Sequence, residues 1–539
     1  MSDTNTKVMA EAATQITAAN TYNQTPYESY PYAQTRPENL KAIAHIFGLE
    51  TPALETARFL ELGCASGGNM ITHATHYPKA KFVGVDLSEV QVEMGNKQIK
   101  ALGLKNIELK AISITDINKS FGEFDYIICH RVLSWVPDNV RDAIFRISDE
   151  NLSKNGIAYI SYNTLPGWHM VRTIRDMMMF HSRNFTDINE QVQQSRLLLD
   201  FVKDSLEGSN SPYGEIMNSE AKLLAGQPDH YLRHDHMEDV NHQYYFHEFM
   251  KKASEHGLQY LGDSSLASMY SGNLPKQISE KLNEVTDIVR SEQYMDFVTN
   301  RRFRSTILCK KNVQLKRNIS GNSLEGLYFS MKILPEKLLK DVTLDNSDTL
   351  EFYYAGLKDN KLNANSPILK ALLYLFNASV NFSLSASSLT TKIKEMLPKN
   401  KYTDEQIMLE IMSNITRLVF CGYIVVSTEK PTFATTASDM PRISDLARVQ
   451  LEAKQGWVTN EVHDRINLSP LDVYTMKYLD GKHNKAQILD ELVKHVVSGE
   501  LKVNKDDKPV TEPKAVMELV KPYLEHCLVA YASNALLVS

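Results

Sequence analysis

The residues of this 539-residue chain that could do the most chemistry follow an apolar run, in the segment FLELGCASGG at residues 59–68. The pattern predicts a strand that ends near Glu61 and a glycine-rich loop that leads into a helix. Gly63 permits a tight turn there, and Gly67 lets a ligand come close to the backbone. Asp86 ends the next apolar run, where its carboxylate can accept both hydroxyls of a ribose. The spacing therefore predicts a loop that binds a nucleoside-containing ligand.

This loop departs from the G-x-G-x-x-G pattern of dinucleotide sites. Ala65 stands at the position of the middle glycine, and the acidic Glu61 precedes the turn. The carboxylate would repel the pyrophosphate of NAD, whereas a positively charged sulfonium would tolerate it. NAD is therefore the second choice for this loop.

Polar and aromatic residues follow two later apolar runs, at residues 124–129 and 156–162. Because open α/β sheets bind ligands beyond the carboxyl ends of their strands, we expect these residues near the site. They are His130, Arg131, Trp135, Tyr162, Asn163 and Trp168. The two tryptophans could instead be packing residues that cap the sheet.

A cluster of five histidines spans 18 residues: His230, His234, His236, His242 and His247. A metal site needs three or four converging ligands with a supporting shell of hydrogen bonds. The cluster lacks cysteine and paired carboxylates of a known type. We therefore expect histidines that form hydrogen bonds at the surface, and no metal site.

The elements that must position these residues alternate along the chain. Helical stretches separate apolar runs at 58–63, 81–86, 107–112, 124–129 and 156–162. Such spacing indicates βαβ units and a doubly wound parallel sheet of the α/β class. We expect 257–262 and 304–309 to close the same sheet, with a helical region inserted before them.

Beyond residue 320 the chain looks like a diverged tandem repeat. Each half starts a helix at Ser-Pro, continues with a second and a longer helix, and ends in an apolar, strand-like tail. The segments are 366–376, 387–397, 405–418 and 422–427 in the first half, and 469–479, 485–497, 514–526 and 528–533 in the second. This order predicts two winged-helix-like units.

Charge and composition limit the partners of the chain. The net charge is −6, and residues 366–430 and 461–534 of the two repeat units together hold 17 basic and 17 acidic residues. Duplex DNA binding would need a basic stripe, so a protein-docking role fits these units better. The five dispersed cysteines, the lack of a signal-like N-terminus and the lack of an apolar run of about 18 residues indicate a cytoplasmic protein without membrane insertion.

The E-x-G-x-x-x-G loop with an acidic residue at the end of the next strand resembles motif I of class I S-adenosylmethionine-dependent methyltransferases. The resemblance implies a Rossmann-like sheet, S-adenosylmethionine as cofactor and S-adenosylhomocysteine as product. It assigns Tyr27 and Tyr30 to a lid, Glu61, Gly63, Ala65 and Gly67 to the methionine side, Asp86 to the ribose, Leu87, Ser113 and Ile114 to adenine, and His130 and Arg131 to the cofactor pocket.

Longer segments carry a closer resemblance, to methyltransferases with a methyltransferase regulatory domain. They are HRVLSWVPD (130–138), SYNTLPGWHM (161–170), and residues 231–249, 257–265 and 292–309. With its two-lobed C-terminal half, the chain is similar to rickettsial protein-lysine methyltransferases that modify surface-exposed outer membrane proteins. The implied order is an arm or lid (1–37), a cofactor-binding core (38–184), a helical regulatory and substrate region with the closing strands (185–315), and two C-terminal units (316–440 and 441–539).

The reaction expected from this resemblance is direct displacement at the sulfonium methyl by a lysine amine. About 99.9% of that amine is protonated at pH 7, so the pocket must lower its pKa by desolvation beside a positive charge. We expect Trp135, Tyr162 and Trp168 to hold the methylated cation by cation–π contact and Asn163 to orient the nitrogen. His130 is the one residue that could act as a base.

Two other functions stay open. One is methylation of a small molecule or a nucleic-acid base, and the other is a catalytically inactive scaffold. Some 220 residues beyond the sheet favour a polypeptide acceptor, and the intact Glu61, Gly63, Gly67 and Asp86 argue against an inactive member. We expect the cofactor site to lie within residues 22–170 and the C-terminal half to be a docking platform. The sequence leaves a homodimer open.

Overall fold

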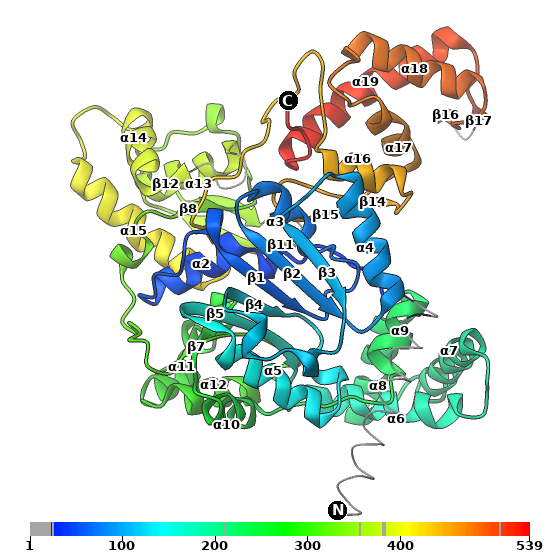
Figure 1. The fold of residues 1–539 in the computed structure, drawn as a ribbon. Helices are drawn as coiled ribbons and strands as arrows, with labels where there is room; N and C mark the ends of the chain where they lie inside the picture. Colours follow the sequence, from blue (N-terminus) through cyan, green and yellow to red (C-terminus); the bar gives the residue numbers. More distant parts are fainter. Residues whose placement is uncertain (1–22, 24–25, 210, 355–356, 380–383, 506–507) are drawn as a thin grey trace, which may run out of the picture.

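The computed structural model describes residues 23, 26–209, 211–354, 357–379, 384–505 and 508–539 (Figure 1). Most of the predicted N-terminal arm, residues 1–22 and 24–25, lies outside the described residues. The segment that enters the fold contains a short helical turn, Ala33–Thr35, and the helix α2, Pro37–Ile46. Gly48 follows this helix with a φ of 79°, a left-handed conformation that glycine readily adopts at a helix end.

The centre of the molecule is a seven-stranded sheet in the order β3-β2-β1-β4-β5-β7-β6. The first five strands pair in parallel, and β7 and β6 add to the edge in antiparallel pairing. The predicted α/β sheet and its two closing strands are therefore confirmed. The strands are β1 (Arg58–Leu62), β2 (Lys81–Asp86), β3 (Ile107–Ala111), β4 (Phe124–Cys129), β5 (Leu152–Asn163), β6 (Leu258–Asp263) and β7 (Phe303–Lys310).

Helices cover both faces of this sheet, as Figure 1 shows. Ser88 caps α4, because its side chain accepts a hydrogen bond from the backbone N–H of Gln91. The helices of this part are α3 (Ile71–His76), α4 (Glu89–Ala101), α5 (Asp138–Glu150) and α10 (Phe246–Glu255). The predicted helical insertion contains α6 (Trp168–Ser182), α7 (Ile188–Ser205), α8 (Pro212–Ala225) and α9 (Asp229–His236).

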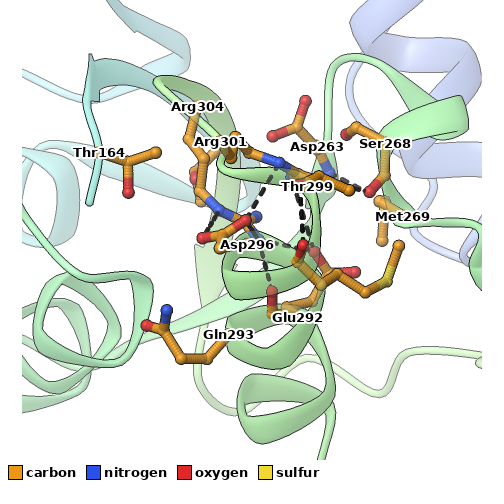
Figure 2. A network of polar contacts seen from close by, with 12 residues as sticks. Thr164, Asp263, Ser268, Met269, Glu292, Gln293, Asp296, Thr299, Arg301 and Arg304 are labelled. Carbon is orange, nitrogen blue, oxygen red and sulfur yellow. Dashed lines mark hydrogen bonds and ion pairs between the residues drawn. The ribbon is translucent and has the colours of Figure 1, made fainter. Parts of the chain in front are cut away.

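A buried ion-pair network fixes the antiparallel edge of the sheet (Figure 2). Arg304 of β7 is 1% exposed and donates to the carboxylates of Asp296 at 2.8 Å and Glu292 at 2.9 Å. Both acidic residues lie on α12 (Ile288–Thr299), which follows α11 (Lys276–Asn283). Arg301 adds a second cation, 3.0 Å from Asp296. The conspicuous charged residues of segment 292–309 therefore hold a helix against a strand.

The first C-terminal unit follows the predicted helix order. Ser366 caps α13 with Pro367 in its first turn, and the tail 422–427 contains the predicted strand, β13. Its elements are β8 (Tyr328–Ser330), β9 (Ile333–Pro335), β10 (Leu350–Tyr354), β11 (Leu357–Ala364), α13 (Pro367–Ala378), β12 (Leu384–Ser385), α14 (Ala386–Met396), α15 (Asp404–Phe420) and β13 (Val425–Ser427).

The second unit departs from the prediction at its end. Residues 528–533 were expected as a strand, but they continue α19, because Leu524, Leu528 and Tyr531 bury one face at helical spacing. The small wing is the pair β16–β17, which precedes that helix. The elements are α16 (Asp445–Glu452), β14 (Trp457–Thr459), β15 (Arg465–Asn467), α17 (Pro470–Lys477), α18 (Lys485–Val497), β16 (Asn504–Lys505), β17 (Lys508–Pro509) and α19 (Pro513–Ser533).

The apolar cores divide the C-terminal half unequally. One cluster of buried residues joins Phe59 and Phe82 of the sheet to Phe329 and Phe352 of the first unit. The second unit has its own cluster, which runs from Ile443 to Leu537. The first unit is thus built onto the sheet, whereas the second has a core largely of its own and contributes Leu446 to the shared cluster. In the described part of the chain, no helix is both long enough and apolar enough to cross a membrane.

Candidate cofactor and active site

A cavity lies at the carboxyl ends of the parallel strands, where open α/β sheets bind ligands. The N-terminal segment, the loop after β1, the ends of β2 and β4, and α9 all contribute to its wall. The predicted residues that line it are Tyr27, Glu61, Gly63, Ala65, Asp86, Leu87, Ser113, Ile114, His130, Arg131 and Trp135. Tyr30, Gly67, Tyr162, Asn163 and Trp168 lie outside this lining.

The loop after β1 has the tight turn that its glycines predict. Gly63 has a φ of 75°, and its N–H donates to the carbonyl of Val85 on the neighbouring strand at 2.8 Å. A Cβ atom on Gly63 would lie 2.4 Å from Cγ2 of Val132, so the position has no room for a side chain. Gly67 has a φ of 76° and shapes the loop without facing the cavity.

Asp86 ties the loop to the second strand. Its carboxylate accepts hydrogen bonds from the backbone N–H of Ala65 at 2.8 Å and of Ser88 at 2.9 Å. Burial raises the pKa of Asp86, and these backbone donors oppose the rise. Because a carboxylate offers about four acceptor positions, two backbone bonds leave capacity for a ligand hydroxyl.

Glu61 is a buried carboxylate at the floor of the cavity, 3% exposed. Oε1 accepts a hydrogen bond from the Asn69 amide at 2.8 Å, and among the described residues Oε2 has no partner. Burial, together with the nearby Asp86, raises the pKa of Glu61 to about 8 although the Asn69 hydrogen bond lowers it. A ligand with a positive group would give this oxygen the partner that the protein does not supply.

The N-terminal segment covers the glycine loop. The Ser29 hydroxyl accepts a hydrogen bond from the Gly68 N–H at 2.8 Å, and the Tyr32 ring lies 4.1 Å from the ring of His130. Tyr27 lines the cavity and meets His234 edge-on at 5.5 Å. Tyr30 instead packs on Trp457 of the second C-terminal unit, 5.3 Å away.

His130 at the end of β4 is held by strand β5. Its Nδ1 lies 3.0 Å from the Tyr159 hydroxyl and 3.1 Å from the Ser161 hydroxyl. Nε2 is buried and has no hydrogen-bond partner in the described structure. Burial, reinforced by the charge of Arg131, lowers the pKa of His130 to about 3. The imidazole is therefore neutral at pH 7 and is a weak proton acceptor.

Three of the predicted catalytic residues do not reach the cavity. Tyr162 is 1% exposed and stacks on Phe249 at 4.1 Å, on the opposite side of β5 from His130. Asn163 is buried next to it. Trp168 lies behind Trp135, with ring centres 6.1 Å apart, so Trp135 alone presents an indole to the cavity.

The helical insertion supplies part of the wall. Asp235 of α9 is buried and pairs with Arg131 at 2.6 Å. The expectation of surface histidines is wrong for His234 and His236, which are 3% and 4% exposed. His234 lines the cavity, whereas His236 packs against Trp168. Across the described residues, no group of three or more potential ligands is placed to hold a metal ion.

Several cavity residues escaped the sequence reasoning. They are Ser29, Tyr32, Cys64, Asn69, Gln91, Val132, Val136, Pro137, Val140, His234 and Asp235. Asn69 directly follows Gly68 in the sequence, so its position next to the glycine loop could have identified it as a cavity residue. His234 and Asp235 belong to the histidine-rich segment. Both are buried in the fold and line the cavity.

Comparisons with known proteins agree with this geometry. Three family models match: a methyltransferase domain (54–224), a predicted methyltransferase regulatory domain (228–310) and the PKMT C-terminal winged helix domain (439–536). An uncharacterized protein of Rickettsia prowazekii is 47% identical over 521 residues, which cover 96% of this chain and 94% of that protein. Two structures of PKMT2 from Rickettsia typhi, one in complex with AdoHcy, match with a TM-score of 0.88, at 37% and 38% identity, over 95% of this chain and 100% of theirs.

Proposed function

The chain belongs to the PKMT family of S-adenosylmethionine-dependent protein lysine methyltransferases, and we propose that it methylates lysine side chains of a surface-exposed bacterial outer membrane protein. The observation that carries the proposal is the match over the whole length of PKMT2, which includes the second C-terminal unit. The choice of an outer membrane protein rests on the resemblance to rickettsial enzymes that modify such proteins. The five free cysteines favour the reducing cytoplasm as its compartment.

The residues of the cavity suit S-adenosylmethionine. The buried and unpartnered Oε2 of Glu61 suits the positive methionine part, and the spare acceptor positions of Asp86 suit the ribose hydroxyls. Leu87 and Ile114 provide apolar contact for adenine, with Ser113 at its polar edge. Tyr27 and Tyr32 would close the pocket from the N-terminal side.

The bound cofactor supplies an electrophilic methyl group on a cationic sulfur, and the protein must bring a neutral amine to it. His130 is a poor base because its pKa is about 3, and its hydrogen bonds to Tyr159 and Ser161 fix the ring in place. The apolar wall at Trp135, together with the positive charge of the cofactor, would lower the pKa of the entering lysine. Alignment of the amine then supplies most of the acceleration.

The acceptor entrance that we propose lies between Trp135 and the Arg131–Asp235 pair. The indole face of Trp135 can accept the methylated ammonium by a cation–π contact. The carboxylate of Asp235 is shared with Arg131, and an entering lysine would compete for it. In this role Trp135 and Asp235 replace Tyr162, Asn163 and Trp168, which lie outside the lining.

Mass spectrometry of candidate acceptors tests the proposed function. Purified enzyme is incubated with S-adenosylmethionine and refolded outer membrane proteins, and in parallel with small amines and nucleosides. We expect methyl groups on lysines of the proteins and none in an Asp86→Ala variant. Methylation confined to the small molecules or to bases would contradict the proposal.

Glycine 68 provides a test of the lid. Replacing Gly68 with alanine would place a Cβ atom 2.1 Å from the carbonyl oxygen of Ser29, so the segment that carries Tyr27 and Tyr32 must shift. Overpacking of this kind costs about 1–3 kcal/mol. We expect binding of S-adenosylhomocysteine, measured by calorimetry, to weaken by roughly tenfold. Gly226→Ala is the matched control, because nothing lies within 4 Å of its added Cβ. Equal affinities of the two variants would show that the segment is not a lid.

The affinity for S-adenosylmethionine is expected to depend on pH through Glu61. The raised pKa of about 8 keeps this carboxyl mostly protonated below that pH, while a positive ligand favours its ionised form. Binding must then release a proton, so affinity should rise with pH between 6 and 8, by up to about tenfold per unit. Calorimetry in buffers of different ionisation enthalpy measures the proton release. Glu61→Gln should bind weakly and without this slope, and an unchanged slope would assign the proton to another group.

A further inference from the structure

A turn of the second C-terminal unit reaches the floor of the cofactor cavity. His463 lies between β14 and β15, is 1% exposed, and places Nε2 2.9 Å from Oδ1 of Asn69. Asn69 in turn donates from its amide nitrogen to Oε1 of Glu61 at 2.8 Å. His463, which is 394 positions from Asn69 in sequence, is thereby joined to Glu61 through the side chain of Asn69.

The chemistry of the acceptors determines which atoms donate and which accept in the hydrogen-bonded chain of His463, Asn69 and Glu61. When Glu61 is ionised it can only accept, so Asn69 must direct its amide nitrogen toward Glu61 and its oxygen toward His463. Burial, reinforced by the nearby His73, lowers the pKa of His463 well below its usual value, so the ring is neutral. The Tyr32 N–H lies 3.2 Å from Nε2 of His463 and 3.1 Å from the Asn69 oxygen. Because that oxygen can only accept, the 2.9 Å contact with it requires the single ring proton on Nε2, and the Tyr32 N–H then donates to the Asn69 oxygen. His463 thus donates to Asn69, and Asn69 donates to Glu61.

Other bonds hold the same oxygen and the same turn. The Asn69 oxygen also accepts from the backbone N–H of Tyr32 at 3.1 Å and from the Thr35 hydroxyl at 2.8 Å. The side-chain oxygen of Asn460 accepts from the N–H groups of Val462 and Asp464, which shapes the turn that presents His463 with a φ of 61°. The N–H of Glu461 donates to the carbonyl of Ala535, so the end of the chain anchors the turn.

Residues next to this turn also contact the N-terminal segment and α3. The ring of Trp457 contacts the ring of Tyr30, and the guanidinium of Arg465 lies 4.3 Å from the centre of the Tyr30 ring. Glu461 pairs with His76 of α3 at 3.0 Å. In Figure 1 the strands β14 and β15 lie to the right of α3. The second unit therefore touches both the lid segment and the helix that follows the glycine loop.

We propose that His463 is a positioning residue of the cofactor site, through which the winged-helix unit orients Asn69 and the Glu61 carboxylate for S-adenosylmethionine. The inference rests on the cofactor placement proposed above and not on the identity of the acceptor protein. His463 does not line the cavity itself. It acts by fixing the amide of Asn69, which binds Oε1 of Glu61 and leaves Oε2, without a partner among the described residues, for the ligand.

Calorimetric titration of the full-length chain with S-adenosylhomocysteine tests this role. Loss of one buried hydrogen bond in His463→Ala should weaken binding by roughly five- to tenfold. His463→Gln keeps an N–H donor and should recover most of the affinity. His483→Ala is the matched control in the same unit, where the ring contacts Asp480 away from the cavity, and it should bind as the parent chain does.

A double-variant cycle separates positioning from a general effect on folding. If His463 acts through Asn69, then Asn69→Ala with His463→Ala should bind no more weakly than Asn69→Ala alone. The KM for S-adenosylmethionine should rise in His463→Ala while kcat at saturating cofactor stays close to that of the parent. The proposal is overturned if the losses add in the double variant, or if folded His463→Ala binds within twofold of the parent chain. Because no acceptor protein enters the titration, failure of the proposed substrate would leave this result unaffected.

Discussion

Replacing Arg304 with alanine is expected to lower the free energy of unfolding by about 3–5 kcal/mol. The guanidinium is buried, stacks 3.9 Å from the ring of Phe246, and neutralises Glu292 and Asp296 on α12. Alanine would leave these carboxylates in an apolar environment with Arg301 as the remaining partner. Chemical denaturation followed by circular dichroism measures the loss.

The control for this substitution lies on α12, the helix whose carboxylates pair with Arg304. Arg290 is exposed and contacts the Tyr294 hydroxyl, so Arg290→Ala should change stability by less than about 0.5 kcal/mol. Arg304→Ala with Glu292→Gln and Asp296→Asn should recover part of the stability, because it removes the unpaired charges as well. A single Arg304→Ala variant as stable as Arg290→Ala would show that the network does not stabilise the edge of the sheet.

The parts of the fold that the sequence predicted well are those that local patterns determine. Mainly apolar runs identified each of the seven central strands. For the five parallel strands the reason is that burial on both faces requires nearly continuous apolar sequence. The positions of Gly63 and Asp86 followed in the same way, since the turn and the next strand end are fixed by spacing. Ser366 and Ser469 marked two helix starts through capping chemistry that acts within a few residues.

The choice of active-site aromatics could not be made from the sequence. Side chains alternate between the two faces of a strand, so a residue at a strand end faces the ligand or the core according to register. On β5, Tyr159 and Ser161 contact His130, while Tyr162 points to Phe249 on the other side. Tyr32 was missed for a different reason, because nothing in its own segment indicates that the ring covers His130.

Contacts between distant segments were also beyond local reasoning. The expected limits of the cofactor site, residues 22–170, are too narrow, because Asp235 lines the cavity and His463 bonds to Asn69. No spacing rule connects a histidine in a β-turn with a carboxylate some 400 residues earlier. Such a pair is found only when tertiary packing brings the two units together.

The unequal division of the cores leads to opposite expectations for two deletions. Removing residues 320–539 should give an insoluble or unfolded product, because the sheet and the first unit share one apolar cluster. The Thr428 N–H also donates to the Glu38 carbonyl, and the Tyr77 hydroxyl bridges the carboxylates of Glu38 and Glu429. We therefore expect the first unit to be inseparable from the sheet. Soluble expression and a cooperative thermal transition of this form would contradict the argument.

Removing residues 439–539 should instead leave a folded protein, because the second unit has its own core between Ile443 and Leu537. This form loses the bond from His463 to Asn69 and the contacts of Trp457 and Arg465 with Tyr30. We expect it to bind S-adenosylhomocysteine at least tenfold more weakly than the full chain. A single lost buried hydrogen bond costs about 1–1.5 kcal/mol of binding free energy, which already corresponds to roughly tenfold, and several contacts are lost. The same titration should be made with His463→Ala. Its smaller loss of affinity gives the part of the total loss that is due to this histidine. Unchanged affinity of the shortened chain would mean that the winged-helix unit contacts the cofactor site without supporting it.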